Sequence, residues 1–233
     1  MPILMYHVIN PPIPNAPYPG LYVPKREFAQ QMDALAKAGF VGVTLGQLWR
    51  HWQTGASLPA GRPVVISFDN GYQSQYSNAL PILVRLGWKA IENLQLSGLP
   101  PSEGGLSEEQ VRGLIAAGWE LDTQGYSHAE LTALSRSQLR FQVLDARRTL
   151  QRRYNVPVNW FCYPSGHYNA AVIEMVKEAG FIGSTTVIPG WAHRTTNPYT
   201  LPRLRVLGGT TGAQLISLIE GTKEEPAPPA AYE

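Results

Sequence analysis

The amino-acid sequence predicts an α/β fold in which a parallel barrel is preferred over an open sheet. The run from Val64 to Phe68 is mostly β-branched or aromatic and stops at Asp69-Asn70-Gly71, as expected of a strand buried on both faces. A glycine followed by an aromatic residue ends four predicted helices and opens the next strand: Gly39-Phe40, Gly87-Trp88, Gly118-Trp119 and Gly180-Phe181. The last three pairs lie 31 and 62 residues apart, close to one and two βα units, which indicates repeated strand–helix units.

Composition limits the class of protein. A chain of 233 residues suits one large α/β domain, and a formal charge of +2 with 15% charged residues argues against nucleic-acid binding by charge alone. No apolar run reaches membrane-spanning length and no signal peptide is visible, although the strand-like start at Met1-Pro2-Ile3 is compatible with a removed export signal. The lone Cys162 excludes an intrachain disulfide and cannot by itself form a thiolate metal site.

In the first half of the chain, apolar periodicity and turn residues give these predicted elements. Residues 3–7 form a strand, and the proline-rich residues 11–24 form an irregular loop. Phe28, Met32 and Leu35 share one helical face before Gly39, and a short helix capped by Thr44 runs to Trp52. Further strands are predicted at 41–43, 64–68 and 88–94, and a helix at 75–86 despite a proline at position 81.

The second half of the chain continues the alternation of predicted strands and helices. Residues 98–105 form a loop, and Ser107 with Gln110 makes a capping box for a helix through residue 117. Ser135 caps a long helix. The remaining strands are predicted at 119–122, 159–162, 181–186 and 203–207, with helices at 169–179 and 210–219. We therefore expect a single domain over residues 1–221, followed by a flexible Pro/Ala-rich tail over residues 222–233.

Polar and titratable residues follow several of these strands. Because the carboxyl ends of parallel strands meet on one rim of a barrel, this rim is the expected position of an active site. The residues concerned are His7, Asp69-Asn70, Glu92-Asn93, Gln124, His128 and the segment 163–167. For Asp69 alone, an Asx turn that reverses the chain is the simpler interpretation.

Three segments resemble the main motifs of the polysaccharide deacetylases, carbohydrate esterase family 4. These are SFDNGYQSQYSNALPIL (67–83), WELDTQGYSHAELTALS (119–135) and FCYPSGHYN (161–169), and ILMYH (3–7) and LPRLRV (201–206) resemble flanking segments of one secreted branch. The resemblance implies a single distorted (β/α)7-type barrel. It also implies a divalent metal, zinc, held by one Asp and two His, which activates water against an acetyl group, with a neighbouring Asp as general base.

Transferred to this sequence, the resemblance gives Asp69 the position of the catalytic base. Asn70 stands where the family has its metal-binding Asp, Gln124 stands at the first histidine of the His-x-x-x-His pair, and His128 stands at the second. Cys162 stands where many members have an Arg that orients the base. Amide oxygens are poor ligands for a catalytic transition metal, so we expect a degenerate site with weak or absent zinc binding.

Each of these residues also has a plainer interpretation. Asp69 is either a surviving base or a structural carboxylate, and His128 is either a metal ligand or a histidine bonded to backbone. His7 and His167 are possible auxiliary residues of a substitute site, or polar lining. The substrate-binding residues implied are Tyr163, Pro164, Ser165, Gly166 and Trp191; for the aromatic ones, loop packing is the alternative to sugar stacking.

Two functions follow from the resemblance. The first is a hydrolase that removes N-acetyl or O-acetyl groups from a cell-surface or cell-wall glycan, cleaving a non-peptide carbon–nitrogen bond or an acetyl ester. The alternative is an inactive relative that binds an acetylated glycan or a partner protein through the same groove. The resemblance implies an acetylated polysaccharide or oligosaccharide as partner and a secreted or cell-surface location, while a cytoplasmic location stays open.

Overall fold

Parallel strands form one curled sheet in the computed structural model, which describes residues 1–99, 103–224 and 226–232. Residues 100–102 of the predicted loop and residues 225 and 233 of the predicted tail lie outside the described residues. The strands follow the order β7-β6-β5-β4-β3-β1-β8, and β2 pairs with β3 off this path. Their bounds are β1 Ile3–Tyr6, β2 Phe40–Val43, β3 Arg62–Asn70, β4 Ile91–Leu94, β5 Glu120–Thr123, β6 Trp160–Cys162, β7 Gly183–Thr185 and β8 Leu204–Arg205.

The sheet closes through the segment that leads into β8. Leu201 bridges Thr185 in parallel, and its N–H donates to the carbonyl oxygen of Ser184 at 2.9 Å. A few residues later, Leu204 pairs with Leu4 of β1. The predicted distorted (β/α)7-type barrel is therefore confirmed, because one chain segment links the last strand of the sheet to β1.

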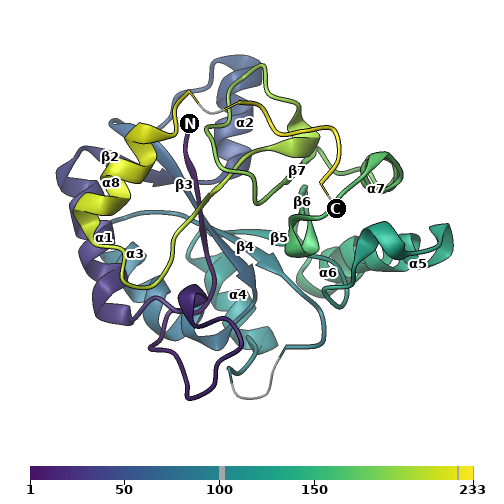
Figure 1. Ribbon diagram of the computed structural model, residues 1–233, viewed down its shortest axis with the longest axis horizontal. Helices are drawn as coiled ribbons and strands as arrows, with labels where there is room; N and C mark the ends of the chain where they lie inside the picture. The colour runs from purple at the N-terminus through teal and green to yellow at the C-terminus, as the bar shows by residue number, and fades with distance from the viewer. Residues whose placement is uncertain (100–102, 225, 233) are drawn as a thin grey trace.

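Helices surround the outer face of this barrel (Figure 1). α1, α3 and α8 lie on one side, and α5, α6 and α7 lie on the opposite side. The helices are α1 Lys25–Lys37, α2 Leu45–Thr54, α3 Leu80–Arg85, α4 Glu108–Ala116, α5 Arg136–Arg140, α6 Ala146–Tyr154, α7 Ala170–Glu178 and α8 Gly212–Gly221. The capping box predicted at Ser107 is present, and the predicted helix caps Thr44 and Ser135 also form capping boxes. No helix among the described residues is long and apolar enough to span a membrane.

Alternation along the strands separates an inner core from an outer core. Ile3, Val65, Ile91 and Trp160 pack together inside the barrel, joined by residues at the start of α2. The intervening residues of β1 and β3, such as Leu4 and Tyr6, pack outward against α1, α3 and α8. Because side chains alternate between faces, the polar residues that share a face with Val65 also point into the barrel.

Two predicted helices differ in detail from the structure. The helix predicted at 75–86 begins as a π-helical turn at Gln75–Ala79 and continues as α3, with Pro81 in the first turn of α3. The long helix after Ser135 contains a second π-helical turn, Phe141–Asp145, between α5 and α6. Pro81 therefore lies inside one continuous helical run, where its missing N–H removes a backbone hydrogen bond.

The C-terminal segment returns to the barrel. Tyr168 and Tyr232 exchange backbone hydrogen bonds of 2.8 Å each, and the Tyr168 hydroxyl donates to the carbonyl oxygen of Pro229 at 2.7 Å. The flexibility of residues 222–233 and the domain boundary at 221 stay predictions. In the structure, the described part of this segment covers Tyr168, whose side chain is fully buried.

The close approach of β7 to the segment before β8 gives a test of the barrel closure. A Cβ at Gly183 would lie 2.1 Å from the carbonyl oxygen of Pro198 and 2.7 Å from the Trp160 ring. Overpacking of this kind costs about 1–3 kcal/mol, so Gly183→Ala should lower the free energy of unfolding by at least about 1 kcal/mol in urea titrations. Gly221→Ala is the matched control because nothing lies within 4 Å of its Cβ position. Equal stabilities of the two variants would contradict the packing described here.

Candidate active-site cleft

A cleft of about 700 Å³ opens at the carboxyl ends of the strands. Asp69, Asn70, Gln124 and His128 all line it, as the sequence predicts. Its remaining walls come from the loop after β1, the turn after β3, the loop after β4, the turn after β6 and the end of β8. These wall residues include Tyr18, Leu21, Tyr22, Tyr72, Gln95, Leu99, Glu103, Tyr163, Ser165, Arg205 and Leu207.

The strand register explains why these residues meet. Asp69 pairs with Asn93 of β4, and Asn93 pairs with Asp122 of β5. One step further along, the Gln95 N–H donates to the carbonyl oxygen of Asn70 at 3.1 Å, and the Gln124 N–H donates to that of Leu94 at 3.1 Å. Parallel strands in this register bring residues from three separate segments to the same rim.

The centre of the site is a buried ion pair between Asp69 and Arg203. Arg203 Nη1 lies 2.7 Å from Asp69 Oδ1 and Nη2 lies 2.8 Å from Oδ2, and both side chains are about 99–100% buried. Asn93 Nδ2 donates to Oδ1 at 2.8 Å. Arg203 Nε donates to the carbonyl oxygen of Thr186 at 2.8 Å. The guanidinium thus binds both carboxylate oxygens in a bidentate arrangement.

This pairing sets the proton affinity of the carboxylate. Burial by itself raises the pKa of Asp69, but the Arg203 guanidinium outweighs burial and brings that pKa down to about 2. The same attraction raises the pKa of Arg203 above its usual value, against the effect of burial. Both groups are therefore charged at neutral pH, and Asp69 is a weak base.

Cys162 occupies the space beside this pair. Its Sγ lies 3.5 Å from Asp69 Oδ2 and 3.2 Å from Arg203 Nη2. Burial raises the pKa of the Cys162 thiol, so the sulfur is uncharged at neutral pH. The guanidinium that the family resemblance places at position 162 is supplied here by Arg203, from the segment that leads into β8.

The positions expected to hold a metal carry amides. Asn70 Nδ2 donates to Gln95 Oε1 at 3.0 Å, and Gln95 Nε2 donates in turn to the carbonyl oxygen of Ser97. Within the part of the chain that the structure describes, no group of three or more His, Cys, Asp or Glu side chains is arranged to hold a metal ion. His128 with two neutral amides is a poor donor set for zinc, so these residues do not fit the family's metal centre.

The backbone around the cleft is held in an uncommon conformation. Asn70, His128 and Ser165 have φ values of 78°, 51° and 55°, which lie in the left-handed region. Such residues cost about 1–3 kcal/mol each and persist where the surrounding structure determines them. All three line the cleft. The rim therefore keeps a defined backbone geometry, although the side chains at the expected metal positions carry no negative charge.

The two auxiliary histidines differ in position. His7 lines the cleft, with Nε2 4.0 Å from Asp69 Oδ2, and burial lowers the pKa of His7 to about 4. It is therefore neutral at pH 7. His167 Nδ1 instead lies 2.6 Å from Glu130 Oε2 near the surface, and His167 is not among the residues that line the cleft.

Only part of the predicted substrate-binding set borders the cleft. Tyr163 and Ser165 do, and the Tyr163 hydroxyl donates to the carbonyl oxygen of Tyr199 at 2.9 Å. Pro164 and Gly166 are buried in the short turn beside them. Trp191 lies elsewhere, because its Nε1 donates to the carbonyl oxygen of Ile219 at the end of α8.

Sequence reasoning missed the most important partner of Asp69. Arg203 was part of a recognised segment, LPRLRV, but its separation of 134 residues from Asp69 gave no sign of contact. The segment holds two arginines, Arg203 and Arg205, and no local pattern shows that Arg203 is buried while Arg205 is exposed. The cleft walls at Tyr18 and Glu103 lie in irregular loops, where no pattern predicts position.

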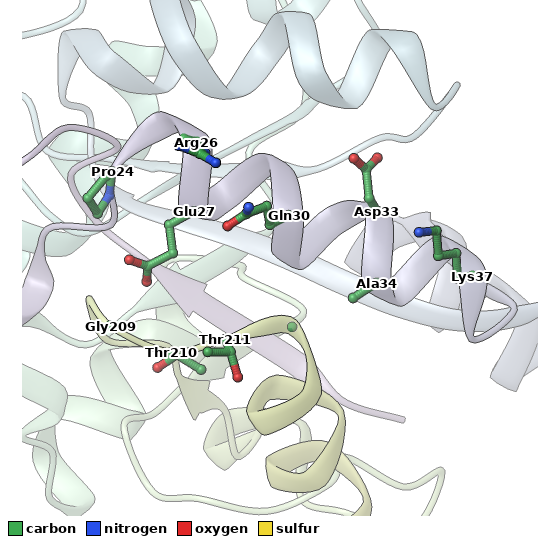
Figure 2. Close-up of a pocket in the computed structure, with 11 residues that line it drawn as sticks. Pro24, Arg26, Glu27, Gln30, Asp33, Ala34, Lys37, Gly209, Thr210 and Thr211 are labelled. Carbon is green, nitrogen blue, oxygen red and sulfur yellow. The ribbon is translucent and has the colours of Figure 1, made fainter.

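A second hollow lies between α1 and the segment that begins α8 (Figure 2). It measures about 730 Å³ and has mixed charges along one helix, including Arg26, Glu27, Asp33 and Lys37. The first N–H groups of α8 are capped by Thr211. None of the predicted site residues lines this hollow, so the cleft at the strand ends is the candidate site.

The fold and the cleft define an α/β barrel with a buried carboxylate at its mouth. The sequence profile of the family described as polysaccharide deacetylase matches residues 58–183. This chain therefore belongs to the polysaccharide deacetylase family.

Individual relatives agree with this assignment. The chain is 29% identical over 223 residues to YxkH of Bacillus subtilis (strain 168), whose name also places it among polysaccharide deacetylases; the alignment covers 96% of this chain and 77% of YxkH. The solved Streptococcus pyogenes deacetylase PplD, in complex with acetate, superposes with a TM-score of 0.84 at 25% identity, covering 94% and 97% of the two chains. The Bacillus cereus polysaccharide deacetylase BC0361 has the same fold, with a TM-score of 0.80 at 22% identity over 93% of this chain and 68% of its own.

Removal of Arg203 tests the ion pair. Arg203→Met removes the guanidinium and leaves the Asp69 charge buried without compensation, which typically costs about 3–5 kcal/mol. We expect this loss in the free energy of unfolding at pH 7, measured by urea titration. Arg194→Met, at an exposed position, should stay within about 0.5 kcal/mol of the parent. The double variant Asp69→Asn/Arg203→Met should recover part of the loss, and a change below about 1 kcal/mol in Arg203→Met would contradict the pairing.

Proposed function

We propose that this protein binds an acetylated glycan in the cleft and does not remove its acetyl groups through a metal-activated water. The observation that carries the proposal is the bidentate pairing of Asp69 with Arg203, next to amides at the metal positions. Membership of the polysaccharide deacetylase family supports the class of ligand. The same membership favours a secreted or cell-surface location.

The state of Asp69 argues against its use as a general base. A base is most effective when its pKa lies near the working pH, and the pKa of Asp69 is about 2. Its oxygens already accept hydrogen bonds from Arg203 and Asn93. A proton taken from water would have to displace or weaken these contacts, so the carboxylate acts here as a structural anion.

The amides argue against water activation by zinc. Lowering the pKa of a bound water toward neutrality requires a tightly held cation, and structural or catalytic zinc is held mainly by Cys, His, Asp and Glu. Asn70 and Gln124 supply no negative charge, and the Asn70 amide is already bonded to Gln95. A metal-activated water is therefore not part of the proposed function.

The remaining features of the cleft suit binding. Aromatic residues provide apolar faces with a polar edge, and several of them line the walls, including Tyr18, Tyr22 and Tyr72. Amides and hydroxyls near the base of the cleft provide directional hydrogen bonds. A concave site with apolar walls and a few oriented polar groups is the usual form of a small-ligand site.

Hydrolysis by a rebuilt site is the second candidate. The observation that favours it is His7, a neutral imidazole at neutral pH whose Nε2 lies 4.0 Å from Asp69. A neutral histidine next to a carboxylate is a possible acid–base group without a metal. Release of acetate by the metal-free protein, lost in His7→Gln, would favour this candidate.

The binding proposal predicts three results for the wild-type protein. Calorimetric titration with a chito-oligosaccharide should show saturable binding, dialysis against a weak chelator should leave no stoichiometric zinc, and acetate should not rise above background.

Tyr18→Ala should weaken binding several-fold, because Tyr18 is 70% exposed at the cleft wall. Phe141→Ala, another exposed aromatic outside the cleft, is the control. Stoichiometric zinc together with acetate release would overturn the proposal.

The lost metal site should also be repairable. Asn70→Asp together with Gln124→His restores a carboxylate and an imidazole beside His128, so the double variant should bind zinc. Each single variant should bind much more weakly, and the two effects should be non-additive because the side chains share one ion. Calorimetric titration of zinc into the parent, the two single variants and the double variant measures these affinities. A parent that binds zinc as tightly as the double variant would refute the degenerate-site argument.

A further inference from the structure

We infer that Gln124 makes the cleft selective for an acetyl group attached through an amide N–H over one attached through an ester oxygen. The inference rests on the proposed function, since it concerns how the same cleft recognises its glycan. It names Gln124 as the residue that determines specificity.

The observation is an unpaired acceptor on a residue that lines the cleft. The Gln124 side chain is only 3% exposed, and its residue lines the cleft. Within the described residues, Gln124 Oε1 is buried and has no hydrogen-bond partner. The neighbouring amides differ, because Asn70 and Gln95 bond to each other and Gln95 also bonds to backbone.

A buried acceptor of this kind favours a ligand that brings a donor. The N–H of an acetamido group is such a donor, whereas the linking oxygen of an acetyl ester has no hydrogen to give. A site built to bond a particular polar group discriminates strongly against an analogue without it, because the protein group is then left unpaired. A deacetylated amino sugar is also disfavoured, since its ammonium would lose water at a site that offers one neutral acceptor.

His7 supplies a second unpaired atom that could bond to the same acetamido group. Among the described residues that line the cleft, His7 Nδ1 is the other buried side-chain atom without a partner. A neutral imidazole carries one N–H, which on Nδ1 would donate to the acetyl carbonyl. An acetamido group offers one donor and one acceptor, and the two unpaired atoms of the cleft match that pair.

The test compares three probes on a β-1,4-linked pyranose backbone. They are a chito-oligosaccharide, its fully deacetylated form and an O-acetylated cello-oligosaccharide, each titrated calorimetrically against the full chain. We expect the amide probe to bind at least about tenfold more tightly than the ester probe. Gln124→Met keeps the side-chain volume and removes the acceptor, so it should lower affinity for the amide probe about tenfold and leave the ester probe unchanged. Gln53→Met, an exposed change on α2, is the control.

The outcomes separate the inference from the proposed function. Equal affinity of the wild type for the amide and ester probes would overturn the inference while the binding proposal stands. Absence of binding by every probe would overturn the proposed function, and the inference with it. Retention of amide selectivity in Gln124→Met would also overturn the role of this residue. If that variant fails to fold, the comparison of probes on the wild type still decides the selectivity.

Discussion

The ion pair between Asp69 and Arg203 is the interaction on which the rest of the structure depends. It joins the end of β3 to the segment that closes the barrel, and both partners are almost completely buried. Loss of one partner from such a pair costs about 3–5 kcal/mol, because the other charge is left without compensation. Arg203 also lies between Leu201, which bridges β7, and Leu204, which pairs with β1. The same contact therefore holds the barrel closed and fixes the floor of the cleft.

This constraint explains how the family's fold persists when the metal-ligand positions are neutral. A cation beside Asp69 would normally balance its charge, and here the guanidinium does so with two short hydrogen bonds. The Asn70 amide donates a hydrogen bond to Gln95. The cleft keeps its left-handed rim residues, including His128 and Ser165. The cleft thus keeps its shape and its hydrogen-bonding groups, which is what the proposed binding function requires.

The sequence predicted the fold class well because alternation of apolar strands and capped helices is a local signal. The convergence of Asp69, Asn70, Gln124 and His128 was also predictable, since parallel strands end on one rim. Arg203 was not, because contact across 134 residues has no local signature. The π-helical turns at 75–79 and 141–145 were also not predictable, because a π-helical turn does not change which residues of the helix are apolar. The position of Trp191 beside the end of α8 was not predictable either, because an aromatic residue in a loop carries no pattern that gives its direction.

The most direct test of the central claim is the ionisation of Asp69 itself. Its carboxyl carbon can be followed by ¹³C NMR in protein labelled at aspartate, with Asp69→Asn identifying the resonance. Because the pKa of Asp69 is lowered to about 2, the group should stay ionised from pH 7 down to about pH 3 and protonate only below that. The resonance at pH 7 should not move when excess zinc is added. Protonation near pH 4 or above, or a shift on addition of zinc, would contradict a carboxylate neutralised by Arg203.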